Sequence, residues 1–180
     1  MAKDKLLPFK IISIAALLLS AFAVIQILFS QELLTLPSLP LAPAVTDLST
    51  IGFVEVTPDA SVVGDAGVVG LTGGCYQVVA NTDVVQAQSI IDGMRGKIME
   101  RPNMHDVTTE IFGALDIKIL MVKIVDLKEN NYIGKLIIQQ GDKVLSLDSR
   151  PSDGIALAVR TNSTIYFKES LLKEMGKYIC

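Results

Sequence analysis

The sequence lacks the patterns that identify several common catalytic centres. Its 180 residues contain no Cys/His spacing typical of a zinc site, no glycine-rich phosphate loop and no serine nucleophile elbow. Histidine occurs once, at His105, and cysteine twice, at Cys75 and Cys180. The two cysteines would pair if the protein lies in an oxidising compartment, but their spacing leaves that question open.

Positive charge is missing from a long part of the chain. No Lys or Arg lies between Lys10 and Arg95, whereas six acidic residues lie between Leu33 and Met94. From Arg95 onward, 13 basic residues face 11 acidic ones, and the whole chain has a net charge of −3. Neither part has the basic surplus that drives non-specific binding to nucleic acid. A nucleic-acid role must therefore depend on a local patch.

The longest apolar run lies near the N-terminus. Residues 11–31 contain no charged side chain, and about 20 such residues in a helix cross a bilayer core of about 30 Å. We therefore predict a transmembrane helix over residues 11–31. The alternative is a cleaved signal peptide, because Ala21-Phe22-Ala23 resembles a cleavage site, although the apolar run continues beyond it.

The flanking residues predict the topology. Three lysines precede the apolar run, which predicts a cytoplasmic N-terminus at residues 1–10 and a domain on the extracytoplasmic side. Residues 32–50 contain three prolines among small and apolar residues, a composition typical of an extended stalk. We thus expect a single-pass membrane protein with a domain at residues 51–180.

The pattern of that domain predicts the α+β class, as a single compact domain with helices packed on a mixed or antiparallel sheet. Apolar residues at helical spacing predict helices, and short Val/Ile-rich segments between turns predict strands. The expected N-caps are Thr82, Asn103 and Ser152. The expected strands are 51–56, 67–71, 75–80, 117–125, 132–139, 144–148 and 164–167, and the expected helices are 84–98, 104–114, one from 152, and 169–178.

One stretch, residues 147–160, concentrates charged residues at a turn before an apolar helix. Its proline disfavours helical backbone at Arg150, so the turn lies there and Ser152 is the expected cap. Asp153 then lies in the first helical turn, and Asp148 lies on the more polar side of the preceding strand. Helix capping or a strand end explains each of these residues separately, but a turn needs only one of them. The presence of Asp148, Arg150 and Asp153 around one turn therefore favours a functional site.

An earlier helix start has a similar sequence. Arg101-Pro102-Asn103 precedes the helix at 104–114, as Arg150-Pro151-Ser152 opens the later helix. If the two starts lie together, their free N–H groups and arginines form a site for phosphate or another anion. The simpler interpretation is that this sequence is a good way to begin a helix.

These two segments resemble the paired signatures of the bifunctional nuclease family. The first is Arg101-Pro102-Asn103-Met104-His105-Asp106, and the second is the sequence DSRPSDGIALA at 148–158. The resemblance covers roughly Ile51 to Met175 and implies a compact, oligomeric α+β domain that hydrolyses phosphodiester bonds of DNA and RNA. Gln86 stands where the family usually has Glu, which removes a carboxylate. Met104 stands where it usually has Thr, which shifts the cap to Asn103.

Phosphodiester hydrolysis needs an activated water, cations near the phosphate oxygens and a proton for the leaving group. His105 is the single side chain whose ordinary pKa suits neutral acid–base work, although a lone His at a helix start is also commonly a surface or capping residue. The candidate catalytic residues are His105, Asp106, Asp148 and Asp153, the candidate substrate contacts are Arg101, Arg150 and Ser152, and the candidate ligands of Mg²⁺ or Mn²⁺ are Asp148 and Asp153.

Two hypotheses of function follow. In the first, the protein is a membrane-anchored nuclease that uses the acidic residues and arginines with a divalent cation, and its partners are DNA or RNA, the membrane and further copies of the chain. In the second, it is a non-catalytic binding or scaffold module tethered to the membrane, and the same residues serve helix starts and subunit contacts. Loss of cleavage in chelator distinguishes the first hypothesis.

Overall fold

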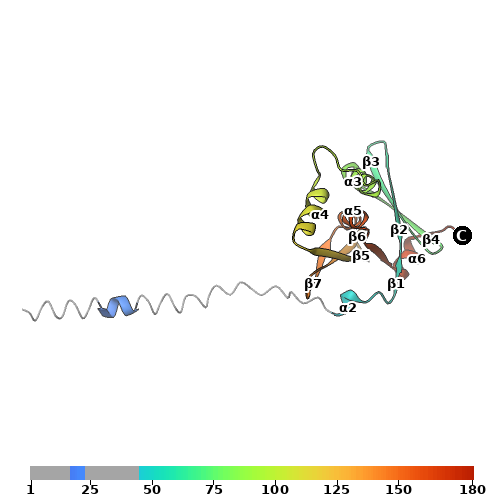
Figure 1. The fold of residues 1–180 in the computed structure, drawn as a ribbon. Coiled ribbons are helices and arrows are strands. Elements are labelled where there is room, and N and C mark those ends of the chain that lie inside the picture. Colours follow the sequence, from blue (N-terminus) through green and yellow to red (C-terminus); the bar gives the residue numbers. More distant parts are fainter. Residues whose placement is uncertain (1–16, 23–44) are drawn as a thin grey trace, which may run out of the picture. The chain divides into compact units, whose positions relative to one another are not determined.

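The computed structural model describes residues 17–22 and 45–180, and Figure 1 shows the domain that residues 45–180 form. Residues 17–22 are helical. No helix within the described residues is long and apolar enough to cross a membrane. The predicted N-terminus at 1–10, the rest of the predicted transmembrane helix and most of the predicted stalk lie outside the described residues, so these assignments stay predictions.

A five-stranded mixed sheet organises the domain. Its middle strand is β5 (Ile117–Lys128), which runs parallel to β8 (Thr164–Lys168) and antiparallel to β6 (Asn131–Gln140). β1 (Phe53–Glu55) pairs with β8 at one edge, and β7 (Lys143–Ser149) pairs with β6 at the other. The predicted α+β class with a mixed sheet is therefore confirmed.

A second sheet was not predicted. It is antiparallel and consists, in order, of β2 (Thr57–Val63), β3 (Ala66–Gly73), β4 (Tyr76–Thr82) and β9 (Lys177–Tyr178). The sequence analysis predicts the β3–β4 hairpin but not β2, which contains Pro58, a residue that interior strands rarely accept. The proline is tolerated because β2 is an edge strand, where a missing N–H need not break a ladder bond.

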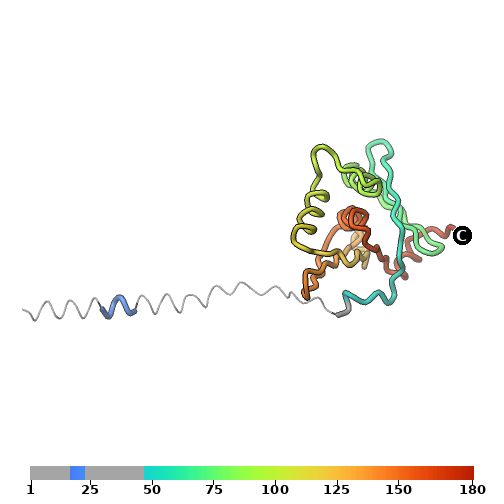
Figure 2. Tube along the Cα trace, in the orientation of Figure 1, coloured from blue at the N-terminus to red at the C-terminus, as the bar shows by residue number. Residues whose placement is uncertain are grey.

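The C-terminal residues also differ from their prediction. The last helix, α6, spans Glu169–Met175 rather than 169–178, and the residues after it pair with β4. Cys180 forms a disulfide with Cys75, 105 residues earlier, which answers the question that their spacing left open. Figure 2 shows the C-terminus beside the turn of the β3–β4 hairpin. The crosslink and the strand pairing hold these residues extended, and closing a long loop restricts the unfolded chain.

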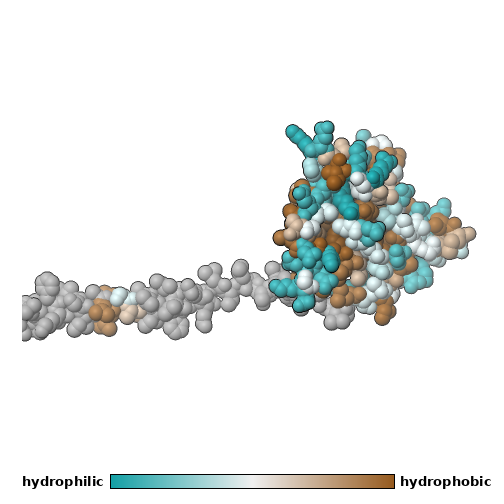
Figure 3. Space-filling view, in the orientation of Figure 1, coloured by the Kyte–Doolittle hydropathy of each residue, from teal (hydrophilic) through white to brown (hydrophobic). Residues whose placement is uncertain are grey.

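α5 (Pro151–Thr161) is the buried helix of the domain. It packs on β5 and β6, and α3 (Val84–Met94) and α4 (Met104–Ala114) lie against it (Figure 1). Its glycine allows this close packing, since a Cβ at Gly154 would meet the Val122 side chain of β5 at 2.8 Å. The outer surface mixes hydrophilic and hydrophobic residues in the view of Figure 3. Two helices, α3 and α4, are therefore held against the buried apolar segment of α5.

Two of the three predicted N-caps are wrong. α3 follows Asp83 rather than Thr82, and it ends at Met94 rather than at 98, because Gly96 adopts a φ of 62° that the helix cannot continue. α5 begins at Pro151, so Arg150 takes the cap position and Ser152 lies in the first turn. Proline suits this position because a first-turn N–H has no helical partner to lose.

The last residues assigned to the stalk pack on the domain. After α2 (Val45–Leu48), the ammonium of the buried Lys123 in β5 donates to the backbone carbonyl oxygens of Asp47 (3.2 Å) and Ser49 (2.8 Å). It also lies 4.0 Å from the ring centre of Phe53. Burial lowers the pKa of Lys123, although the charge of Asp47 opposes this shift. These contacts join the segment before residue 51 to the middle strand.

Candidate active site

The start of α4 directs His105 toward α5. Asn103 Oδ1 accepts hydrogen bonds from the backbone N–H groups of His105 (2.8 Å) and Asp106 (3.1 Å). In return, the Asp106 carboxylate accepts one from the Asn103 N–H (3.0 Å). This capping box satisfies N–H groups that a helix start leaves free, and it confirms Asn103 as the predicted cap. It also fixes the backbone that carries the His105 ring.

The start of α5 carries Arg150 and Asp153. Arg150 Nε donates to Asp153 Oδ2 at 2.9 Å, and Arg150 Nη2 lies 3.5 Å from Asp153 Oδ1. The pair faces the surface, with 65% of the Arg150 side chain and 30% of the Asp153 side chain exposed. The hydrogen bond from Arg150 to Asp153 raises the pKa of Arg150, and the negative charge of Asp153 acts in the same direction. Arg150 is therefore a fixed cation at the helix start.

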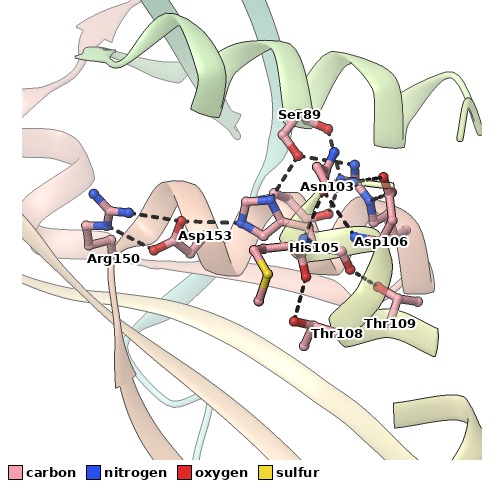
Figure 4. Close-up of polar contacts among 11 residues, drawn as sticks. Ser89, Asn103, His105, Asp106, Thr108, Thr109, Arg150 and Asp153 are labelled. Carbon is pink, nitrogen blue, oxygen red and sulfur yellow. Dashed lines mark hydrogen bonds and ion pairs between the residues drawn. The ribbon is translucent and has the colours of Figure 1, made fainter. Parts of the chain in front are cut away.

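The two helix starts lie together, which is the condition for a shared site. His105 Nε2 lies 3.3 Å from Asp153 Oδ1, a contact between residues 48 positions apart. Figure 4 shows His105, Asp153 and Arg150 in a row that leads from the helix interface to the exposed guanidinium. Arg101, at the other helix start, is exposed. The structure thus joins His105 of the first segment to Asp153 and Arg150 of the second.

On its inner side, the His105 ring contacts a residue that the sequence did not indicate. Its Nδ1 lies 2.9 Å from Oγ of the buried Ser89 in α3. Arg160, near the end of α5, donates from Nη2 to Ser89 Oγ (3.1 Å) and from Nη1 to the backbone oxygens of Ser89 (2.9 Å) and Ala156 (2.8 Å). Serine in mid-helix and arginine in a last turn are ordinary patterns, so no local signal marked either residue.

Arg160 also forms a buried ion pair with Asp106. Arg160 Nε donates to Asp106 Oδ1 at 2.7 Å, and only 6% and 7% of the two side chains are exposed. Burial raises the pKa of the Asp106 carboxyl, but the hydrogen bonds from Arg160 and the Asn103 backbone, with the charges of Arg160 and His105, outweigh it and hold the pKa below its ordinary value. Asp106 therefore joins α4 to α5 and holds the start of α4, which carries His105, in position.

Asp148 lies in a different environment. Its Oδ1 is 2.7 Å from Lys135 Nζ on the neighbouring strand β6, and 82% of its side chain is exposed. The hydrogen bond to Asp148 raises the pKa of Lys135, against the desolvation of the lysine. Asp148 thus lies on the strand that leads to the site, and within the described part of the chain it pairs with Lys135 rather than with His105 or Asp153.

An open cavity of about 1180 Å³ adjoins the start of α5. Its walls come from β4, the β5–β6 turn and the junction of β7 with α5. Three residues predicted from the sequence, Asp148, Arg150 and Ser152, line it together with Lys135. Its charged lining residues are of both signs, so the cavity offers local cations and not a strongly basic wall.

Gln86 lies three residues before Ser89 on α3, where the family resemblance leads us to expect Glu. Its Oε1 is buried and has no hydrogen-bond partner in the part of the chain that the structure describes. A glutamate here would place a charged oxygen in the same surroundings, which is far more costly to bury unpaired than an amide oxygen. The neutral Gln86 side chain therefore costs less free energy to bury at this position than a glutamate would.

As they are arranged, the predicted metal ligands Asp148 and Asp153 are each paired with a cation of the chain. Over residues 17–22 and 45–180, no group of three or more His, Cys, Asp or Glu side chains could hold a metal ion. The predicted ligands each face a cation instead, since Asp148 contacts Lys135 and Asp153 contacts Arg150. Mg²⁺ is usually bound through one or two carboxylates together with waters and substrate phosphates, so the described residues by themselves do not test it. The expected Mg²⁺ or Mn²⁺ stays a prediction, and the steps proposed below use only the chain's own residues.

Comparison with known proteins identifies the region that contains this site. A family model described as the bifunctional nuclease domain matches residues 78–179, which include α3, α4, α5 and the central sheet strands β5 to β8. Two uncharacterized proteins from two strains of Mycobacterium tuberculosis are each 33% identical to the chain over 94 residues. The matched residues are 52% of this chain and 56% of each relative, so the chain spans about half the length of the curated relatives it matches.

Proposed function

The chain belongs to the bifunctional nuclease domain family, and from that premise we propose that it binds DNA or RNA and hydrolyses phosphodiester bonds beside Arg150 and Asp153. The observation that carries this proposal is the contact of His105 with Asp153, because it joins the starts of two helices next to an exposed arginine. The N–H groups of His105 and Asp106 at the start of α4 already donate to Asn103, so Arg150 is the group that would bind the phosphate, and arginine matches phosphate in two-point contacts.

Arg150 is the proposed phosphate contact. Its ion pair with Asp153 is largely exposed, and exposed pairs contribute little free energy because water screens them. A phosphate oxygen can therefore replace the Asp153 oxygen at the guanidinium. That exchange releases Asp153 Oδ2 while Oδ1 keeps its contact with His105.

Asp153 is then the proposed general base. Its free Oδ2 takes a proton from a water molecule as the water oxygen bonds to phosphorus, and the bond from phosphorus to the leaving oxygen breaks. His105 donates a hydrogen bond to Oδ1 and stabilises the carboxylate in its position. The leaving oxygen receives its proton from solvent, which reaches the exposed side of the site.

Lys135 and Ser152 extend the proposed substrate surface along the cavity, and Asp148 orients Lys135 through its ion pair. A strand that enters the cavity meets these groups and Arg150. Since lining charges of both signs are present, binding depends on a few phosphate contacts, in keeping with the small net charge of the chain.

The membrane placement is a further part of this proposal. We propose that residues 11–31 anchor the domain on the extracytoplasmic side. The Cys75–Cys180 disulfide supports that placement, because disulfides persist in oxidising compartments. Exposed apolar side chains near the ends of α3 and α4, such as Val85, Ile98 and Met104, support the homo-oligomer that the sequence leads us to expect.

A binding or scaffold module is the second candidate function. It is favoured by one observation: each predicted catalytic carboxylate already pairs with a cation, Asp106 with Arg160, Asp148 with Lys135 and Asp153 with Arg150. Such pairs hold elements together without any reaction. A module of this kind would bind nucleic acid or another partner and leave it intact.

Cleavage assays on the full chain test the proposal. We expect wild-type protein to cleave single-stranded DNA or RNA, and Asp153→Asn, His105→Gln and Arg150→Lys each to lower the rate by roughly 10²-fold or more. Glu169→Gln is the matched control, because it neutralises one acid of an exposed ion pair on α6 (2.6 Å to Lys173). Assays with and without chelator show whether a divalent ion takes part. Binding without cleavage under all metal conditions would contradict the nuclease and support the binding module.

A further inference from the structure

We infer that Ser89, oriented by Arg160, holds His105 in the tautomer that carries the ring proton on Nε2. A hydrogen-bond chain runs through Arg160, Ser89, His105 and Asp153, and Figure 4 shows it in part. The tautomer assignment deepens the proposed function, on which its catalytic consequence rests. The geometry of the chain itself does not depend on any activity.

The inner end of the hydrogen-bond chain determines the direction of its bonds. A guanidinium can only donate, so the contact of Arg160 Nη2 with Ser89 Oγ (3.1 Å) makes the hydroxyl oxygen an acceptor. The single hydroxyl proton of Ser89 is left to donate, and His105 Nδ1 is the acceptor at 2.9 Å. If Nδ1 carried the proton instead, this buried hydroxyl would lose its acceptor, which costs free energy at a buried position.

The outer end of the hydrogen-bond chain requires the same arrangement. An ionised carboxylate only accepts, so the contact of Asp153 Oδ1 with His105 Nε2 (3.3 Å) needs a proton on Nε2. A neutral imidazole has one donor and one acceptor nitrogen, and both neighbours of His105 demand the same assignment. Ser89 therefore acts on the site through His105 and is a positioning residue.

The Arg160 end of the chain is firmly held. Arg160 donates to Asp106 and to two backbone oxygens besides Ser89 Oγ, and its side chain is buried. Ser89→Ala removes only the hydroxyl, so these other bonds keep α3 and α5 in place. The variant is therefore suited to test the tautomer without loss of the fold.

Nitrogen NMR of the ring tests the inference directly, because His105 is the only histidine in the chain. The full chain is labelled with ¹⁵N-histidine, prepared without a polyhistidine tag, and measured at a pH at which the ring is neutral. We expect wild type to show the proton on Nε2 and Nδ1 as a hydrogen-bonded acceptor. In Ser89→Ala, we expect the Nδ1 resonance to shift to that of an acceptor without a hydrogen bond.

A second variant separates the two ends of the hydrogen-bond chain. In Asp153→Asn the amide can present either oxygen or nitrogen to the ring, so the outer end no longer selects a tautomer; the inner end then keeps the proton on Nε2. Combining Asp153→Asn with Ser89→Ala removes both constraints and gives a mixture of tautomers. This comparison includes a test within Asp153→Asn alone, so it stays informative if Ser89→Ala fails to fold.

Thr109→Val is the matched control. Thr109 Oγ1 donates to the His105 backbone oxygen at 2.8 Å and does not take part in the ring contacts given above, so its loss should leave both ring resonances unchanged. A wild-type ring with its proton on Nδ1, or an Nδ1 resonance that does not move in Ser89→Ala, would overturn the inference.

The activity of the same variants is a separate result. If the chain is a nuclease, Ser89→Ala should lower kcat and leave KM nearly unchanged, because buried Ser89 does not contact substrate. A chain that cleaves nothing but shows the expected resonances would refute the proposed function and leave the tautomer assignment intact. An active chain with the opposite tautomer would refute only the assignment.

Discussion

Two ion pairs of the candidate site have the same length but different surroundings. Arg160 Nε and Asp106 Oδ1 are 2.7 Å apart between nearly inaccessible side chains, and Lys135 Nζ and Asp148 Oδ1 are also 2.7 Å apart, at the surface. Water can replace either partner of the exposed pair, whereas nothing replaces a partner of the buried pair. The buried pair therefore holds helices together, and the exposed pair leaves its groups available to a ligand.

The pair formed by Arg150 and Asp153 lies between these extremes. Its arginine is mostly exposed, but its carboxylate also contacts His105, whose side chain is only 14% exposed. This intermediate exposure suits a carboxylate that must release Arg150 and keep its contact with His105. We therefore expect that the unfolding free energy lost with each ion pair depends on the burial of the pair and not on the distance between its atoms.

The largest expected effect comes from Arg160→Met. The change leaves the Asp106 carboxylate buried without its cation, and breaking a buried pair in this way costs roughly 3–5 kcal/mol of unfolding free energy. Urea unfolding followed by circular dichroism measures it. Arg160→Lys keeps the positive charge without the planar guanidinium and should lose less unfolding free energy. A cost below about 1 kcal/mol for Arg160→Met would contradict the assigned role of the buried pair.

The second largest expected effect is a loss of unfolding free energy at low pH. The folded pKa of Asp106 lies below its ordinary value, so this group contributes stability that is present above the unfolded pKa and is lost as the pH falls through the folded pKa. The window therefore begins near the ordinary Asp pKa, about 3.9, and extends to lower pH. Unfolding free energies measured across this window should fall more steeply for wild type than for Asp106→Asn. Equal slopes would show that Asp106 carries no pairing energy.

The third effect is that of Asp153→Asn on stability. A charge near a helix start that also pairs with an exposed arginine is expected to contribute about 0.5–2 kcal/mol, less than the buried pair. Thermal unfolding at low and high salt measures it, and added salt should reduce the difference from wild type. A loss as large as that of Arg160→Met would place Asp153 with the structural residues.

Asp148→Asn should have the smallest effect. Its carboxylate is mostly exposed, so loss of the pair should change the unfolding free energy by no more than about 0.2–1 kcal/mol. The pKa of Lys135 should fall toward its ordinary value, because the hydrogen bond to Asp148 is the main cause that raises it. NMR titration of the Lys135 side chain measures this shift. An unchanged Lys135 pKa would show that the pair does not persist in solution.

The features of the site that were predicted correctly depend on residues that are neighbours in the sequence. Asn103 is the predicted cap of α4, and the turn before α5 lies at Arg150 and Pro151 as predicted, because backbone sterics and capping act within a few residues. The Ser152 cap was wrong for an equally local reason, since proline itself fits the first helical position. β2 was missed because its pairing with β3, not its own pattern, makes it a strand.

By itself, the sequence determined the class of the domain, its family signatures and the placement of charged groups at two helix starts, because periodicity and turn chemistry are properties of neighbouring residues. Only the tertiary structure decided what those groups contact. The bond from Arg160 to Ser89 joins residues 71 positions apart, that to Asp106 spans 54, and the contact of His105 with Asp153 spans 48. Each requires α3 or α4 to pack in one orientation against α5, and that packing depends on shape complementarity across the whole core, which no local pattern encodes.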